Sequence, residues 1–131
     1  MRDEAWVVAG GVYCLAFALF HLAFWKLFGW RQDLRSLTAV NRAVVQILNL
    51  CLTFAFLVFA FVSLLYPSEM TGTGLGRALL LLIAAFWLLR AVEQVIFFGL
   101  RRRVSLAFFV TFLLGTALYL LPWLTDGQAG P

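Results

Sequence analysis

The chain has 131 residues, of which 64% are hydrophobic and only 12% are charged, and its formal net charge is +4. This composition, with one histidine and two cysteines, excludes a disordered chain, a disulfide scaffold and a collagen-like repeat. A soluble globule of this length could not bury so much apolar surface, so the composition indicates an integral membrane protein.

Four apolar segments are long enough to cross about 30 Å of hydrocarbon, a distance that takes roughly 20 residues of helix. Their continuous apolar character fits helices and differs from the alternating strands of a membrane barrel. The sequence predicts an all-α integral membrane protein, a four transmembrane helix bundle that forms a single domain over residues 1–131. In chain order, the expected spans cover about residues 5–28, 42–66, 76–100 and 104–124.

Between the second and third spans, Pro67 ends one helix and a glycine-rich stretch follows. We expect residues 67–75 to form a turn, with Thr71 or Thr73 capping the third span.

The charged residues predict how the spans are oriented. Because four spans alternate the connections between two sides, one side receives seven basic residues and the other two. Basic residues in short connections stay in the cytoplasm. We therefore expect residues 29–41 and 101–103 to be cytoplasmic and both termini to lie on the non-cytoplasmic side of the cell (inner) membrane. Anionic lipid headgroups account for the positive charge, and the pattern does not predict nucleic-acid binding.

Polar side chains inside the first three spans lie at a similar depth, near the expected cytoplasmic ends. On the second and third spans they recur every three or four residues, which places them on one face of each helix. If these faces converge, they line a polar pocket between spans 1, 2 and 3 that opens to the cytoplasmic side. The predicted ligand-binding residues are His21, Arg42, Gln46, Asn49, Arg90, Glu93 and Gln94.

The same residues have a purely structural interpretation, which the sequence leaves open. Arg90 and Glu93 are three residues apart and can form an ion pair on one helix. The amides can hydrogen-bond between helices, each contributing roughly 0.6 kcal/mol and at most about 1.7 kcal/mol. Against this, ionisable residues within a membrane span indicate a functional site by default.

The residue types favour binding over catalysis. No metal site is predicted, because one histidine and two cysteines on different spans do not form a ligand set, and the cofactor is unknown. Arg90 suits a carboxylate or a phosphate, which it can bind through two parallel hydrogen bonds. His21 is the group best suited to exchange a proton. We expect a binding protein or accessory subunit for a lipid headgroup, a quinone or a small anion.

Two other functions stay open. A small transporter would couple proton or solute movement through His21, Arg90 and Glu93, and a membrane-embedded enzyme would act on a lipophilic substrate. The expected partners are membrane lipids. Stripes of small residues, such as Gly10, Cys14 and Ala18, also allow a homo-oligomer or a place in a larger membrane complex, because they let helices approach closely.

Overall fold

The computed structural model describes residues 2–126, and this part of the chain is mainly helical, with no strand. Among these residues, four helices are long and apolar enough to span a membrane, as expected for a membrane protein. The long helices are α1 (Arg2–Leu22), α4 (Ala39–Leu65), α6 (Gly74–Glu93), which continues as η2 (Gln94–Phe98), and α7 (Arg103–Asp126). The short elements are α2 (Phe24–Leu27), α3 (Trp30–Asp33), η1 (Leu34–Ser36) and α5 (Pro67–Gly72).

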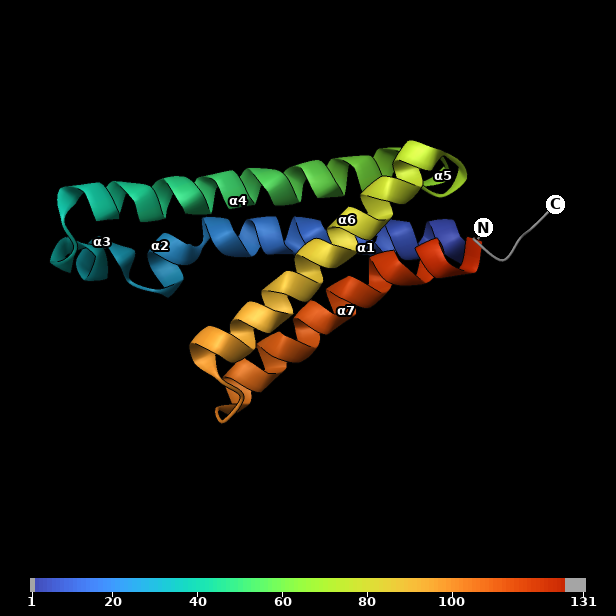
Figure 1. Ribbon diagram of the computed structural model, residues 1–131. Helices are drawn as coiled ribbons and strands as arrows, with labels where there is room; N and C mark the ends of the chain where they lie inside the picture. Colours follow the sequence, from blue (N-terminus) through green and yellow to red (C-terminus); the bar gives the residue numbers. More distant parts are fainter. Residues whose placement is uncertain (1, 127–131) are drawn as a thin grey trace.

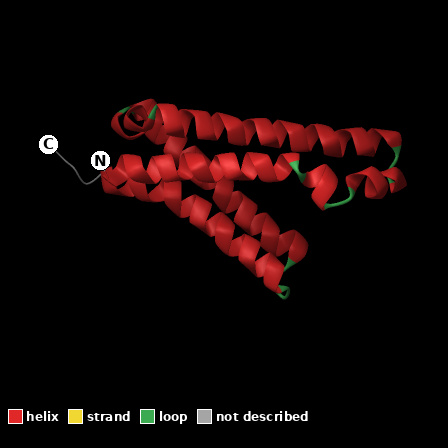
Figure 2. Cartoon of the chain, turned by 180° about the vertical axis from the view of Figure 1, so that it is seen from behind, coloured by secondary structure: helices red, strands yellow, loops and turns green. Residues whose placement is uncertain are grey.

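The long helices form two antiparallel pairs that separate toward one end. Helix α1 packs against α4 and α7, and α6 packs against α7 (Figure 1). From the end that carries α5, the α6–α7 hairpin diverges from the α1–α4 pair, and the same divergence is visible from behind (Figure 2). The two pairs are therefore farthest apart where α2, α3 and the α6–α7 turn lie.

Helices α1 and α7 meet at the end of the molecule that carries α5, which we call the closed end (Figure 1). There Thr125 donates a hydrogen bond to Asp3 at 2.7 Å. At the opposite end lie the connection from α1 to α4 and the α6–α7 turn. We call this opposite end the basic end, after the residues it carries: Lys26, Arg31, Arg35, Arg42, Arg101, Arg102 and Arg103.

The core is aromatic and lies where the two pairs cross. Trp87 of α6 is fully buried and stacks on Phe56 of α4, with ring centroids 5.2 Å apart and planes inclined by 8°. Phe17 of α1 and Phe112 of α7 close the cluster, with centroids 4.9 Å and 6.1 Å from that of Trp87. One ring from each long helix thus joins the two pairs.

Small residues are used within the chain at these crossings. A Cβ built on Gly10 would lie 2.7 Å from the Tyr119 ring, and one built on Gly115 would lie 2.8 Å from the Tyr13 ring. Cys14 and Ala18 are fully buried. The stripe of small residues on α1 therefore brings α1 close to its neighbours in the same chain.

The last three expected spans agree with the helices to within three residues at each end. The first differs, because α1 ends at Leu22 and the chain turns at Ala23. The cause is visible at the His21 carbonyl oxygen, which accepts a hydrogen bond from Asn49 Nδ2 at 3.0 Å. A side chain inserted into the hydrogen-bond ladder of a helix breaks it.

The structure adds two local features that the sequence did not predict, the short helix α5 and the π-helical turn η2. Residues 67–75 contain the short helix α5, which begins at Pro67 because a proline fits the first turn of a helix. The cap prediction is confirmed for Thr73, whose hydroxyl accepts from the Gly76 N–H at 3.0 Å. Helix α6 ends in a π-helical turn, η2, and Gly99 then reverses the chain with a left-handed φ of 66°.

Candidate functional site

The opening between the helix pairs holds a cavity of about 990 Å³. Its walls come from α1 through η1 on one side and from α6, η2 and α7 on the other, and α4 contributes Leu52. The volume lies at the upper end of the usual range for ligand pockets, about 300–1,000 Å³. Phenylalanine is the commonest residue in its wall, at Phe17, Phe20, Phe24, Phe28, Phe98, Phe108 and Phe112.

Charged side chains of predominantly positive sign also line the cavity. Arg102 and Arg103 lie at the basic end, and Arg90 lies deeper, one helical turn before η2. Asp33 supplies the one carboxylate in the described lining. Three guanidinium groups against one carboxylate make the cavity attractive to anions.

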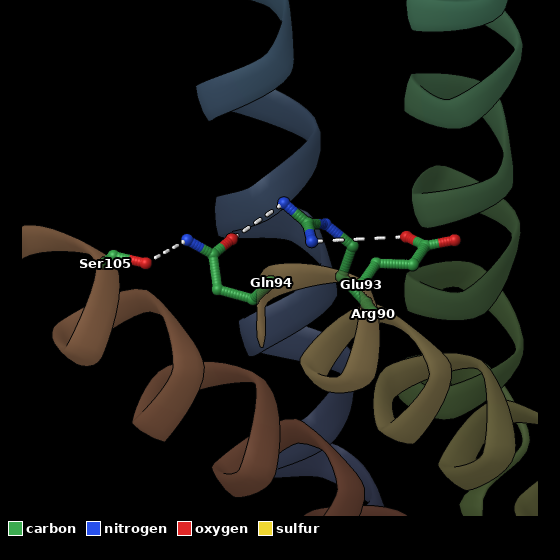
Figure 3. A network of polar contacts seen from close by, with 4 residues as sticks. All are labelled: Arg90, Glu93, Gln94 and Ser105. Carbon is green, nitrogen blue, oxygen red and sulfur yellow. Dashed lines mark hydrogen bonds and ion pairs between the residues drawn. The ribbon is translucent and has the colours of Figure 1, made fainter. Parts of the chain in front are cut away.

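Arg90 is part of a short polar chain that reaches across to α7. Its guanidinium donates to Gln94 Oε1 at 3.1 Å, and Gln94 Nε2 donates to Ser105 Oγ at 2.8 Å (Figure 3). Ser105 in turn donates to the Gly99 carbonyl. Figure 3 shows Glu93 on the opposite side of Arg90, and their charged atoms are 4.0 Å apart. Gln94 is therefore the closer partner.

The Arg90 guanidinium also contacts an aromatic ring. Its guanidinium carbon lies 4.4 Å from the ring centroid of Phe112, which is a cation–π contact. An arginine has five N–H donors. Within the described residues, Gln94 and Glu93 account for its polar contacts, so the other donors are left for a molecule in the cavity.

His21 is held by Asn49 and lines the same cavity. The ring Nδ1 lies 2.9 Å from Asn49 Oδ1, and the ring stacks on Phe24 with centroids 4.2 Å apart. Asn49 is buried between α1 and α4, and the Thr53 hydroxyl donates to the backbone carbonyl of Asn49 at 2.8 Å. The side chain of Asn49 therefore supports His21 from behind the cavity wall.

The predicted site residues divide into two groups. His21, Arg90 and Gln94 line the cavity, as part of the sequence-based set. The other predicted residues, Arg42, Gln46, Asn49 and Glu93, are not among the residues that line it.

Arg42 and Gln46 serve the connection between α1 and α4. The Arg42 guanidinium donates to the Leu34 carbonyl at 2.8 Å and to the Leu37 carbonyl at 3.1 Å. Gln46 accepts a hydrogen bond from the Trp25 indole at 3.1 Å. For these two residues the structure shows contacts that fix the fold of the connection.

The expected position of the pocket needs correction. The sequence predicts a pocket between spans 1, 2 and 3, whereas the cavity lies mainly between the first span and the hairpin of the third and fourth. The physical reason is the tight packing of α4 on α1, which fills the space between them with Asn49, Thr53 and Phe56.

Sequence reasoning missed the residues of α7 and of the turn before it. Ser105, Phe108 and Phe112 gave no signal, because a lone serine and scattered phenylalanines are ordinary in an apolar span. The sequence explains Arg102 and Arg103 by membrane orientation and by anionic lipid headgroups, and the structure adds that both line the cavity.

The groups available for chemistry are few. Among the described residues, no cluster of three or more histidine, cysteine or acidic side chains is close enough to hold a metal ion. The cavity instead offers three guanidinium groups, one carboxylate, an imidazole, an amide and a hydroxyl, set among phenylalanine side chains. Such a set can bind an anionic group and a long apolar group at the same time.

Comparison with known protein families, with curated proteins and with solved structures gives no match to this chain. The chemistry of the cavity therefore carries the functional assignment.

Proposed function

We propose that this protein is an integral membrane protein that binds an anionic lipid in the cavity between α1 and the α6–α7 hairpin. The observation that carries the proposal is the position of Arg90, a guanidinium with unused donors, in the wall of a large aromatic cavity. In this arrangement the phosphate of the lipid binds Arg90 and an acyl chain lies along the phenylalanine side chains.

The apolar wall favours a lipid over a small hydrophilic anion. A small anion would leave the rings of Phe17, Phe20 and Phe108 uncovered, whereas an acyl chain covers them and gains hydrophobic stabilisation. The cavity is also incompletely enclosed, since Phe98 and Val104 in its wall are 68% and 69% exposed. An acyl chain in the surrounding bilayer can enter beside these two exposed apolar side chains.

The basic end is proposed to face the cytoplasm, with both termini on the non-cytoplasmic side. The excess of basic residues at that end supports its cytoplasmic position. The hydrogen bond between Asp3 and Thr125 supports a common side for the first turn of α1 and the last turn of α7. The anionic lipids of a cytoplasmic leaflet would then meet Arg102 and Arg103 first and Arg90 at depth.

Native mass spectrometry of the purified protein with phosphatidylglycerol or phosphatidylcholine tests the proposal. Wild-type protein should retain phosphatidylglycerol in preference, and Arg90→Gln should weaken that binding about tenfold or more, since it removes charge-assisted hydrogen bonds. Arg77→Gln is the matched control, because Arg77 contacts the Trp123 ring at 5.8 Å and is not among the lining residues of the cavity.

Two results would contradict the proposal. The first is equal retention of the two lipids by the wild-type protein. The second is complete displacement of phosphatidylglycerol by inorganic phosphate, which would identify a site for a free anion and leave the aromatic wall without a role.

A further inference from the structure

The two contacts between His21 and Asn49 determine which way the Asn49 amide points. Its nitrogen Nδ2 donates to the His21 backbone carbonyl at 3.0 Å, and a carbonyl only accepts. The oxygen Oδ1 is therefore the atom that lies 2.9 Å from the ring nitrogen Nδ1. An amide oxygen is an acceptor, so the hydrogen-bond network assigns the proton of the neutral imidazole to Nδ1.

This assignment leaves a lone pair on the other ring nitrogen, Nε2. In a neutral imidazole one nitrogen donates and the other accepts. Among the described residues, Nε2 has no hydrogen-bond partner, while the ring faces are covered by Phe24 and by the edge of Phe56, with centroids at 4.2 Å and 5.1 Å. His21, with this acceptor, and Arg90, with its donors, both line the cavity.

We propose that His21 accepts a hydrogen bond from a hydroxyl group on the headgroup of the bound lipid, next to the phosphate that binds Arg90. This inference rests on the proposed function and specifies its ligand class: anionic phospholipids with a hydroxylated headgroup. An anion alone would use Arg90 and leave Nε2 without a donor, and a headgroup hydroxyl provides one.

The test compares two anionic lipids that differ in the hydroxyl groups alone. Phosphatidylglycerol and phosphatidylpropanol have the same phosphodiester charge and a three-carbon headgroup, but phosphatidylpropanol has no headgroup hydroxyl. Binding to the purified wild-type protein is measured by native mass spectrometry, with phosphatidylcholine as the zwitterionic reference. We expect phosphatidylglycerol to bind about fivefold more tightly than phosphatidylpropanol, as one additional hydrogen bond requires.

Three variants test which residue causes the preference for phosphatidylglycerol over phosphatidylpropanol. His21→Phe keeps the aromatic packing against Phe24 and should bind the two anionic lipids equally. Asn49→Leu removes the group that fixes the ring and should lower the preference below about twofold. Asn41→Leu is the control on the same helix, because Asn41 is exposed and outside the cavity, and it should retain the wild-type preference.

The outcomes separate the two proposals. If wild-type protein prefers both anionic lipids to phosphatidylcholine but does not distinguish them, the inference about His21 is wrong and anionic lipid binding stands. If neither anionic lipid is preferred, the proposed function fails and the inference fails with it. A preference that persists in His21→Phe would show that another group binds the hydroxyl. The absorption spectrum of the purified protein gives one more outcome. A Soret band in the wild-type protein that is absent from His21→Phe would show an iron porphyrin bound to Nε2 and would overturn the inference.

Discussion

Gly10 of α1 lies directly against the ring of Tyr119 of α7, so closely that a Cβ at Gly10 would be 2.7 Å from the ring. Tyr119 is fully buried, and its hydroxyl lies 2.9 Å from Ser63 Oγ and 3.3 Å from Cys14 Sγ. This contact joins α1, α4 and α7 at the closed end of the molecule. It holds the two helix pairs together on one side, while the cavity separates them on the other.

The first prediction concerns this contact. Gly10→Ala forces the Tyr119 ring to move and should destabilise the protein by about 1–3 kcal/mol, the usual cost of overpacking a core. Gly72→Ala is the control, because nothing lies within 4 Å of a Cβ built there. Unfolding of the purified variants in detergent measures the difference. Equal unfolding midpoints for the two variants would show that α1 and α7 do not approach as described.

The second prediction tests the buried hydroxyl. Tyr119→Phe leaves Ser63 without its partner and should cost roughly 0.6 kcal/mol, with about 1.7 kcal/mol as the upper bound for such bonds. In the Ser63→Ala background the same change should cost less, because the partner group is already absent. A double-mutant cycle on unfolding free energies measures the coupling. Additive effects would mean that the two hydroxyl groups do not interact.

The third prediction concerns the partner of Arg90. Gln94 is buried and bonded to Arg90 at 3.1 Å, whereas the Glu93 side chain is 43% exposed and 4.0 Å away. Double-mutant cycles with Arg90→Gln should give a larger coupling for Gln94→Leu than for Glu93→Gln, because the contact between Arg90 and Gln94 is the shorter and more buried of the two. A larger coupling to Glu93 would support the simple ion pair predicted from the spacing of the two residues.

The sequence predicts the number and approximate limits of the long helices, because length and hydropathy alone decide them. The break at Ala23 gave no such signal, since Leu22, Ala23 and Phe24 are as apolar as the helix before them. It depends on Asn49, which is distant in the sequence and reaches the His21 carbonyl only after α4 has packed on α1.

The cavity could be anticipated in part. The helical spacing of polar residues identified Arg90 and Gln94, and the lone histidine was also singled out. The contribution of α7 could not be anticipated, because the divergence of the α6–α7 hairpin is a property of helix packing and not of any one span. For the same reason Arg42 was expected in the pocket, although it caps backbone carbonyls of the neighbouring connection.

The fourth prediction concerns orientation in the membrane. In a background without the native cysteines (Cys14→Ala and Cys51→Ser), Arg102→Cys should resist an impermeant thiol reagent in intact cells and react after the membrane is opened. Thr125→Cys, at the other end of α7, should react in intact cells. The reverse pattern would place the basic end on the non-cytoplasmic side.

The central claim is that an anionic lipid occupies the cavity. Photo-crosslinking with a phosphatidylglycerol whose acyl chain carries a diazirine tests it most directly, with the adducts located by peptide mass spectrometry. We predict adducts concentrated on Phe17, Phe20 and Phe108, and a marked loss of these adducts in Arg90→Gln. Adducts confined to the exposed face of α4, at Ile47 and Phe54, and unchanged in Arg90→Gln, would contradict the claim.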